Sequence, residues 1–330
     1  GGKLGGRDIE WFKVDDESEP SKGVENATKL VQRDKVDVLI GTVHSGVQMG
    51  IQRVVRDSGT LCLIPNAGVH AATRALCAPN VFRTSFTNSQ PTLALGKAMM
   101  DKGHKKAVWI TWKYAAGDEA FEGFKESYTA AGGTIVKELG LPFPNVEFQA
   151  LLTEIASIKP DAVACFFAGG GAAKFIRDYA AAGLKGRIPL YGSGFLTEGV
   201  LDAAGPAADG IITTMHYSDS LDTPRNKQFR SAYASQFKMQ PDVYAVQGYD
   251  TGLLLTQGAA AVKGDLANKQ ALYKAMEAAT IDSPRGRWTM SKAHNPVQDM
   301  YLRVVENKEN KVIGVAAKAL ADSGAGCKMA

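Results

Sequence analysis

Short runs of β-branched and aromatic residues recur along the first two thirds of the chain, and most are continuous apolar stretches without strict alternation. Such runs are typical of strands buried on both faces of a parallel sheet. Segments with helical spacing lie between them, as at 24–31 and 121–128. This alternation predicts right-handed βαβ units in open doubly wound sheets, which bind ligands at the carboxyl ends of their strands. We expect strands at 9–14, 36–41, 61–65, 107–112, 134–138, 161–167, 188–192 and 210–215.

The pattern changes after residue 215, where helical spacing dominates up to about residue 279, and MYLRVVENKENKVIGVA then predicts two strands around a polar turn. Strand, loop and helix also run in a similar order twice, from 9 to 103 and from 107 to 204. A single core stops growing at roughly 250 to 300 residues. The 330 residues therefore predict an α/β protein of two similar lobes.

Charge and composition exclude several functions. The net charge is +4, from 38 basic and 34 acidic residues that are interspersed, so a nucleic acid is not an expected partner. No apolar run reaches the roughly 18 residues of a membrane span, and the first residues, GGKLGGRD, are not a signal peptide, so an exported form would have lost its leader. Phosphate-loop motifs and metal-ligand spacings are absent, and we expect no cofactor and no metal.

The four cysteines fall into two groups. Cys62 and Cys165 lie inside apolar runs and are expected to be buried. Cys77 and Cys327 lie in loops, where a disulfide would staple the C-terminus in an oxidising compartment. The sequence alone does not prove that pairing.

Two loops of the first half suit an anion. His44 and Ser45 follow a strand and open a helix, so Ser45 is expected to cap it, with the adjacent amides directed at a bound carboxylate. The simpler alternative is that Ser45 only caps. The next strand runs into a second loop of this kind, formed by Asn66, Ala67 and Gly68.

The second half offers aromatic and glycine-rich loops. Tyr114 follows a strand and would wall a planar ligand, or is a surface aromatic. The sequence FAGGGAAKF, with Gly169 and Gly170, opens a helix and either receives an anion or merely permits a tight turn. Tyr244 and Gln247 share one helical face, and core packing is expected for at least one of them.

YGSGF at 191–195 resembles the nucleophile elbow of esterases, but TEG follows where a core helix should begin, and none of the five histidines pairs locally with an acid. Catalysis is therefore not expected. An esterase-like hydrolase using Ser193 and a ligand-sensing module are the alternatives from other functional classes.

Five motifs in order, KVDVLIGTVHSG, LCLIPNAG, CAPNVFRTSF, DVYAVQGYD and SPRGRWTMSKAHNPVQDMYL, resemble the leucine/isoleucine/valine-binding protein family, over essentially all 330 residues. These are type I periplasmic solute-binding components of ABC importers. The resemblance implies a periplasmic monomer that serves a membrane permease, with two lobes joined by three crossovers and closing on the ligand. The expected lobes are 1–104 plus 218–285 and 105–217 plus 286–330. The resemblance also implies that the loops matching His44 to Gly46 and Asn66 to Gly68 hold the ligand carboxylate, with Tyr114 on the second lobe.

Two departures narrow the ligand. Amino-acid binders of this family carry an acid for the ligand ammonium in the loop where this chain has Ser193, Gly194 and Phe195, and bulky aromatics where it has Ala168 to Gly170. A buried ammonium without a partner costs several kcal/mol, so an amino acid, branched-chain or other, is the less favoured alternative. The glycines, together with Phe167, Phe195 and Tyr114, leave room for a flat ring. We therefore expect the aromatic-acid-binding branch, with a benzoate, hydroxybenzoate or phenylpropanoid as ligand.

A further departure lies at the start of the chain. Family members begin with a strand, a ligand-contacting loop and a helix before the segment that resembles GGKLGGRDIEWF. We expect this first βα unit to be absent from the numbered chain, together with any ligand contact it makes.

Overall fold

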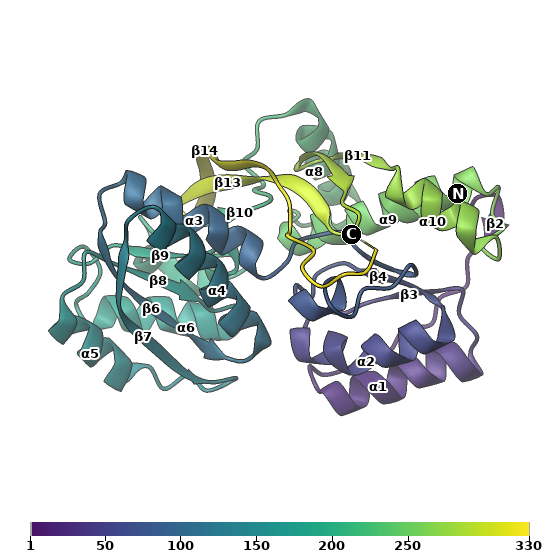
Figure 1. The fold of residues 1–330 in the computed structure, drawn as a ribbon. Helices are drawn as coiled ribbons and strands as arrows, with labels where there is room; N and C mark the ends of the chain where they lie inside the picture. Colours follow the sequence, from purple (N-terminus) through teal and green to yellow (C-terminus); the bar gives the residue numbers. More distant parts are fainter. Residues whose placement is uncertain (1, 330) are drawn as a thin grey trace. The chain divides into compact units, whose positions relative to one another are not determined.

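The computed structural model describes residues 2–329, and the chain divides into two compact units (Figure 1). Unit 1 consists of residues up to Thr87, Tyr244–Gln298 and the segment from Ala321. Unit 2 consists of Asn88–Val243 and Asp299–Leu320.

The chain passes from one unit to the other four times, after Thr87, Val243, Gln298 and Leu320. These boundaries differ from the expected ones. Residues 88–104 and 218–243 belong to unit 2, whereas 286–298 and the C-terminal segment belong to unit 1. The fourth passage arises because the C-terminal segment returns to unit 1, which three crossovers do not provide for.

Unit 1 is built around a short parallel sheet in the order β3-β4-β5, and β11 and β12 form an antiparallel pair. Helix α9 begins with the last residue of unit 2 and continues in unit 1. The core joins Leu61, Leu63 and Phe82 of the sheet to Leu254 and Met276 of the last two helices. The elements are β1 (Lys3–Leu4), β2 (Arg7–Asp8), α1 (Pro20–Thr28), β3 (Val38–Ile40), α2 (Ser45–Ser58), β4 (Leu61–Ile64), β5 (Val81–Arg83), α9 (Val243–Ala261), α10 (Lys269–Glu277), β11 (Thr280–Ser283) and β12 (Gly286–Met290).

The strand predicted at 9–14 does not form. Ile9, Trp11, Phe12 and Val14 are all exposed, Trp11 to 77%. A strand needs a neighbour that completes its hydrogen bonds and covers its side chains. Within residues 2–329 no strand pairs with this segment, so its apolar pattern alone does not make it a strand.

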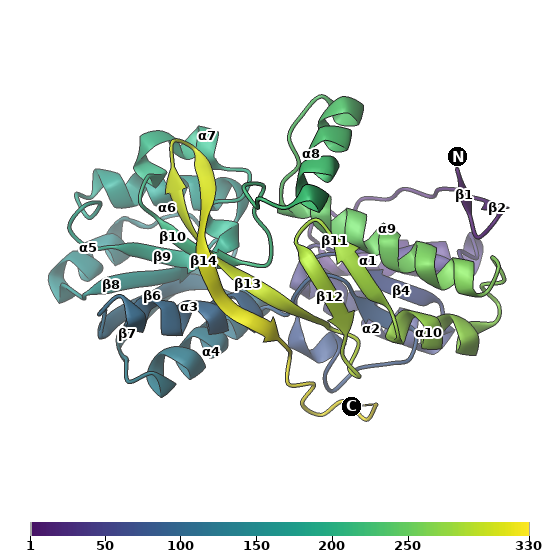
Figure 2. The same ribbon diagram turned by 90° about the horizontal axis from the view of Figure 1, so that it is seen from above.

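Unit 2 carries a larger sheet, with parallel strands in the order β7-β6-β8-β9-β10 and β13 antiparallel to β10. The predicted C-terminal hairpin is confirmed, since β14 pairs with β13 and runs beside it in Figure 2. The elements are α3 (Ser89–Asp101), β6 (Lys106–Lys113), α4 (Ala115–Ala130), β7 (Thr134–Pro142), α5 (Gln149–Ile158), β8 (Ala162–Phe166), α6 (Gly169–Ala181), β9 (Leu190–Ser193), α7 (Leu201–Ala204), β10 (Ile212–Met215), α8 (Pro224–Phe237), β13 (Pro296–Glu306) and β14 (Glu309–Leu320). Strand β13 begins in unit 1, to which its residues up to Gln298 belong.

The central strands of unit 2 are apolar on both faces because helices cover both. In β6, Val108 and Ile110 join a cluster with Leu152 and Phe175 of α5 and α6. Trp109, between them, stacks on Phe124 of α4 with the ring centroids 5.2 Å apart. Successive residues of a strand point to opposite faces, so the continuous apolar run is explained by two helical layers.

The predicted disulfide between Cys77 and Cys327 is confirmed. The disulfide attaches the C-terminal segment to unit 1. Arg74 also forms a bidentate ion pair with Asp322 there, with Nε 3.2 Å from one carboxylate oxygen and a terminal nitrogen 2.8 Å from the other. Cys62 and Cys165 are buried and not bridged. None of the helices in residues 2–329 is long and apolar enough to cross a bilayer.

Candidate functional site

In unit 1 the loop after β3 leads directly into α2. The helix begins at Ser45, and the extended residue before it is His44. His44 is therefore the capping residue, and Ser45 is the first helical residue instead of the expected cap. The buried Ser45 side chain thus lies in the first turn of α2, where backbone N–H groups lack helical partners and the helix dipole favours an anion.

Gly46 makes room for the His44 ring. A Cβ at position 46 would lie 3.0 Å from Cε1 and 3.1 Å from Nδ1 of His44, so only glycine fits without a shift. Burial lowers the pKa of His44 below 6.5, and the nearby carboxylates of Asp16 and Glu19 oppose this without reversing it. The imidazole is therefore neutral at pH 7 and carries one N–H donor.

The second predicted loop of unit 1 is tied to the first. The Ala67 N–H donates to the Thr42 carbonyl at 3.0 Å, which brings the two loops together as expected but uses the Ala67 amide. Asn66 donates from Nδ2 to Oε1 of Gln247 at 2.7 Å, and both side chains are buried. Gln247 therefore joins the loop from α9, whereas Tyr244, one turn earlier, is 36% exposed.

Two supporting groups of unit 1 are absent from the sequence predictions. The buried Arg83 donates to the carbonyls of Ala67 and Val69, and so fixes the loop around Gly68 from below. Gln48 lies beneath the first loop and bonds Gln52. The sequence does contain a pattern that could have indicated Arg83, since an arginine ends the apolar run VFR. A charged side chain that is buried in a strand requires hydrogen-bonding partners of its own.

In unit 2 the loop after β6 places Tyr114 immediately before α4. Its ring packs on Phe143 at 4.9 Å and faces Phe166 at 6.3 Å, between centroids. Burial raises the pKa of the Tyr114 hydroxyl, which keeps it protonated. The residue thus has an aromatic face and a neutral hydroxyl at a strand end, and its role as a wall for a planar ligand stays a prediction.

The strand end of β8 differs from the expectation by one residue. Phe167 is fully buried and packs against Trp112, Phe148 and Phe175 in the core. Phe166 instead contacts Tyr114, and also Phe195 at 6.4 Å in an edge-to-face arrangement. Phe166, the last residue of β8, is therefore the phenylalanine with a ring contact to Tyr114, whereas Phe167, which follows the strand, packs with the aromatic core.

The three glycines at the start of α6, Gly169 to Gly171, differ in what a side chain would meet. Gly169 adopts φ +55°, which favours glycine, and a Cβ at Gly171 would lie 2.4 Å from Trp112. Gly170 has neither restriction, because a Cβ there meets no atom within 4 Å. This loop therefore combines a turn requirement with open space at the start of a helix.

The loop after β9 carries Ser193 and Phe195, both buried. Residues Gly194–Leu196 form a single 3-10 turn, and the next helix, α7, has only four residues. A nucleophile elbow passes from its strand straight into a core helix. The surroundings of Ser193 do not have that arrangement.

An acid lies in this region, although sequence reasoning did not single it out. Glu198 is buried and pairs with the fully buried guanidinium of Arg303. Burial raises the pKa of Glu198, and Arg303 opposes the shift. Glu198 lies only a few residues after the loop of Ser193, Gly194 and Phe195, in which amino-acid binders were expected to carry an acid for the ligand ammonium. Its negative charge is already matched by Arg303.

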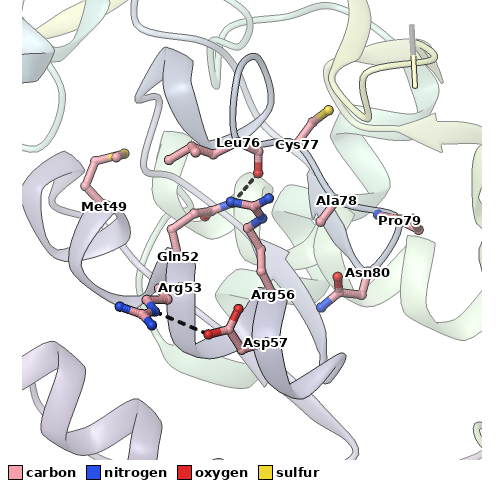
Figure 3. Close-up of a pocket in the computed structure, with 10 residues that line it drawn as sticks. All are labelled: Met49, Gln52, Arg53, Arg56, Asp57, Leu76, Cys77, Ala78, Pro79 and Asn80. Atoms are coloured by element: carbon pink, nitrogen blue, oxygen red, sulfur yellow. Dashed lines mark hydrogen bonds and ion pairs between the residues drawn. The ribbon is translucent and has the colours of Figure 1, made fainter. Parts of the chain in front are cut away.

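Unit 1 also contains a hollow of about 600 Å³ away from the predicted loops (Figure 3). It contains none of the predicted ligand-binding residues, and its polar groups include an exposed ion pair between Arg53 and Asp57. Across residues 2–329, no three His, Cys, Asp or Glu side chains are grouped so as to hold a metal ion. The hollow is lined by Met49, Gln52, Arg53, Arg56, Asp57, Leu76, Cys77, Ala78, Pro79 and Asn80.

Known proteins are similar to this chain over nearly its whole length. A solute-binding protein of an ABC transporter from R. palustris, solved in complex with benzoate, is 55% identical with a TM-score of 0.96, covering 99% of this chain and 90% of that one. A second, from Rhodopseudomonas palustris BisB5 in complex with 3,4-dihydroxybenzoic acid, is 30% identical with a TM-score of 0.91, covering 98% and 90%.

Among curated proteins, the Leu/Ile/Val-binding protein homolog 6 of Brucella abortus is 29% identical over 322 residues, which covers 94% of this chain and 80% of the relative. The family model described as periplasmic binding protein matches residues 1–310. The two α/β units and the strand-end loops are the features expected of that fold. This chain therefore belongs to the periplasmic binding protein family, of type I.

Proposed function

We propose that this chain is the solute-binding component of an ABC importer and captures a small aromatic carboxylate of the benzoate, hydroxybenzoate or phenylpropanoid type. The observation that carries the proposal is the pairing of Glu198 with Arg303. An amino acid brings an ammonium group that needs a carboxylate of its own. Here the acid beside the candidate loop is already neutralised, which favours a ligand that has a carboxylate and no ammonium.

The ligand carboxylate is assigned to unit 1. The start of α2 offers a helix dipole that favours an anion, with Ser45 in its first turn and His44 beside it. Asn66 and Gln247 add amide groups from a loop that is tied to the first one through Thr42. These groups are neutral hydrogen-bonding partners, which suits a carboxylate that must also be released.

The ligand ring is assigned to unit 2. Tyr114, Phe166 and Phe195 gather at the strand ends, and edge-to-face or offset contacts with a benzene ring contribute about 0.5–1.5 kcal/mol each beyond burial. The open side of Gly170 leaves space next to this group. Relatives with 55% and 30% identity that were solved with benzoate and 3,4-dihydroxybenzoic acid support the same ligand class.

Calorimetry with matched ligands tests the proposal. Phenylacetate and phenylglycine differ only by the α-ammonium, and benzoate and leucine represent the two ligand classes. We expect micromolar or tighter binding of benzoate or phenylacetate, and at least about 100-fold weaker binding of phenylglycine, because an unpaired buried charge costs several kcal/mol. Tight binding of leucine with no binding of any aromatic acid contradicts the ligand assignment and leaves the amino-acid alternative.

The family is one of solute-binding proteins, and its members work in the periplasm. We infer that this chain acts as a monomer that delivers its ligand to a membrane permease without catalysing a reaction. Turnover of p-nitrophenyl esters that disappears in Ser193→Ala would instead support the esterase alternative. A gene neighbourhood with a sensor kinase in place of permease subunits would support the sensing alternative.

A further inference from the structure

Two arginines, one in each unit, lie at the centre of buried polar networks close to the points where the chain changes unit. In unit 2, Arg303 lies on β13 shortly after the passage at Gln298. In unit 1, Arg285 donates to Asp250 of α9 at 2.6 Å and to the Thr84 carbonyl at 2.9 Å, three residues before the passage at Thr87. Buried charges of this kind persist only when their hydrogen bonds are satisfied.

The partners of Arg303 use all of its donor nitrogens. Nε donates to Thr213 at 3.1 Å, one terminal nitrogen donates to Glu198 and to the Tyr217 carbonyl, and the other donates to the Gly194 carbonyl at 3.1 Å. Gly194 packs so closely on this group that a Cβ would lie 2.7 Å from the guanidinium. The loop next to Phe195 therefore cannot shift without disturbing Arg303.

Glu198 extends the network to the chain passage. One of its oxygens pairs with Arg303, and the other accepts the backbone N–H of Val243 at 3.4 Å. Val243 is the last residue of unit 2 and the first residue of α9, the helix that next carries Tyr244 and Gln247. The Arg303–Glu198 pair thus connects the Gly194 loop to the first residue of the helix that carries Gln247.

We propose that Arg303 and Glu198 are positioning residues that couple the Gly194 loop to the first turn of α9, and so set how fast the bound ligand leaves. The inference rests on the proposed function, because the loop and the helix carry groups assigned to the ligand. A ligand ring against Phe195 holds the loop, Arg303 transmits that restraint to Glu198, and Glu198 holds the N–H of Val243. Loss of any bond in this chain leaves the ligand contacts in place but accelerates dissociation.

The sharpest test removes a single hydrogen bond. Val243→Pro deletes the N–H that donates to Glu198, at a first helical position that proline tolerates. Val243→Ala is the matched control, since it shortens the same buried side chain and keeps the N–H. Stopped-flow measurement of benzoate dissociation, with urea unfolding of each variant, compares them. We expect dissociation about 10-fold faster in Val243→Pro than in Val243→Ala, because changes within one binding site appear mainly in the dissociation rate.

A second pair of variants keeps the test decisive if proline disrupts the helix. Glu198→Gln weakens the link to Arg303, whereas Asp250→Asn weakens the corresponding Arg285 network without touching the Gly194 loop. We expect faster benzoate dissociation only in Glu198→Gln, although both proteins lose stability. Equal dissociation rates in both comparisons, or rates that simply follow the loss of stability, overturn the coupling. Failure of the wild-type protein to bind benzoate would instead overturn the proposed function.

Discussion

The strand-end loops of the two units have the same local construction and opposite chemistry. In unit 1 the loops after β3 and β4 present His44, Ser45 and Asn66, all neutral groups that form hydrogen bonds. In unit 2 the loops after β6 and β8 present Tyr114 and Phe166, which pack as aromatic rings. The shared topology directs the proposed ligand to the strand ends, and the side chains there are the reason for assigning its carboxylate to unit 1 and its ring to unit 2.

In each unit, a buried arginine also donates hydrogen bonds to backbone carbonyls of a candidate site loop. Arg83 bonds the carbonyls of Ala67 and Val69 in unit 1, and Arg303 bonds the Gly194 carbonyl in unit 2. An arginine offers five donors in a fixed plane, so it can fix several carbonyls at once. The polar loop of unit 1 and the Gly194 loop of unit 2 are therefore held by the same kind of side chain.

The largest expected effect distinguishes the two helix starts that suit an anion. Ser45→Asp places a carboxylate in the first turn of α2, where the helix dipole tolerates it but a ligand carboxylate is repelled. Like charges in contact cost several kcal/mol, so benzoate affinity should fall about 100-fold or more. Gly170→Asp is the matched change at the start of α6, where a Cβ meets no atom within 4 Å. Calorimetry on both variants should show the large loss only for Ser45→Asp, and the reverse order would exchange the roles of the two units.

An intermediate effect is expected from the two adjacent phenylalanines. Phe166→Leu removes the ring that faces Tyr114 and Phe195, and should weaken benzoate binding about 5- to 10-fold, since an aromatic contact contributes about 0.5–1.5 kcal/mol. Phe167→Leu changes a core ring by the same chemistry and should lower the free energy of unfolding with little change in affinity. Affinity and urea unfolding measured on both variants check this. A larger loss of affinity in Phe167→Leu would show that Phe167, the residue predicted from the sequence, contacts the ligand instead of Phe166.

The smallest effect concerns the charge of His44. Its pKa lies below 6.5 because of burial, so above that pH the ring is neutral, and it gains a proton only as the pH falls through the lowered pKa. Benzoate affinity should therefore be constant from about pH 6.5 to 8. His44→Ala should lower it only about 3- to 10-fold at every pH, the usual contribution of one neutral hydrogen bond. Wild-type affinity that weakens steadily with rising pH in this range would show that a charged His44 holds the carboxylate.

Local patterns predicted much of the fold. The alternation of apolar strands and helices, the C-terminal hairpin and the disulfide follow from spacing and loop position, and the structure has all three. The segment at 9–14 has the same apolar pattern but forms no strand, because pairing with a neighbour is a property of the whole sheet. The unit boundaries near Thr87 and Gln298 likewise depend on tertiary contacts, which local patterns do not contain.

Backbone topology alone placed the loops at His44 and Asn66 after neighbouring strands, and the structure brings these two loops together through Thr42 and Ala67, whereas their contact with a ligand stays a prediction. Side-chain contacts within the candidate site could not be predicted from the sequence, because they depend on which direction each side chain points. A continuous apolar run does not reveal the neighbours of each residue, so the pattern that pointed to Phe167 did not indicate the contact of Phe166 with Tyr114. The pairing of Glu198 with Arg303 joins residues 105 positions apart, and no pattern of spacing indicates it.

A crystal structure of the benzoate complex most directly tests the assignment of the ligand carboxylate to unit 1 and of the ligand ring to unit 2. We expect the carboxylate oxygens to lie within hydrogen-bond distance of the first turn of α2, next to Ser45 and His44, and the ring to lie against Phe195 and Tyr114. A carboxylate bound at Gly169 and Gly170, with the ring against the loops of unit 1, would contradict it.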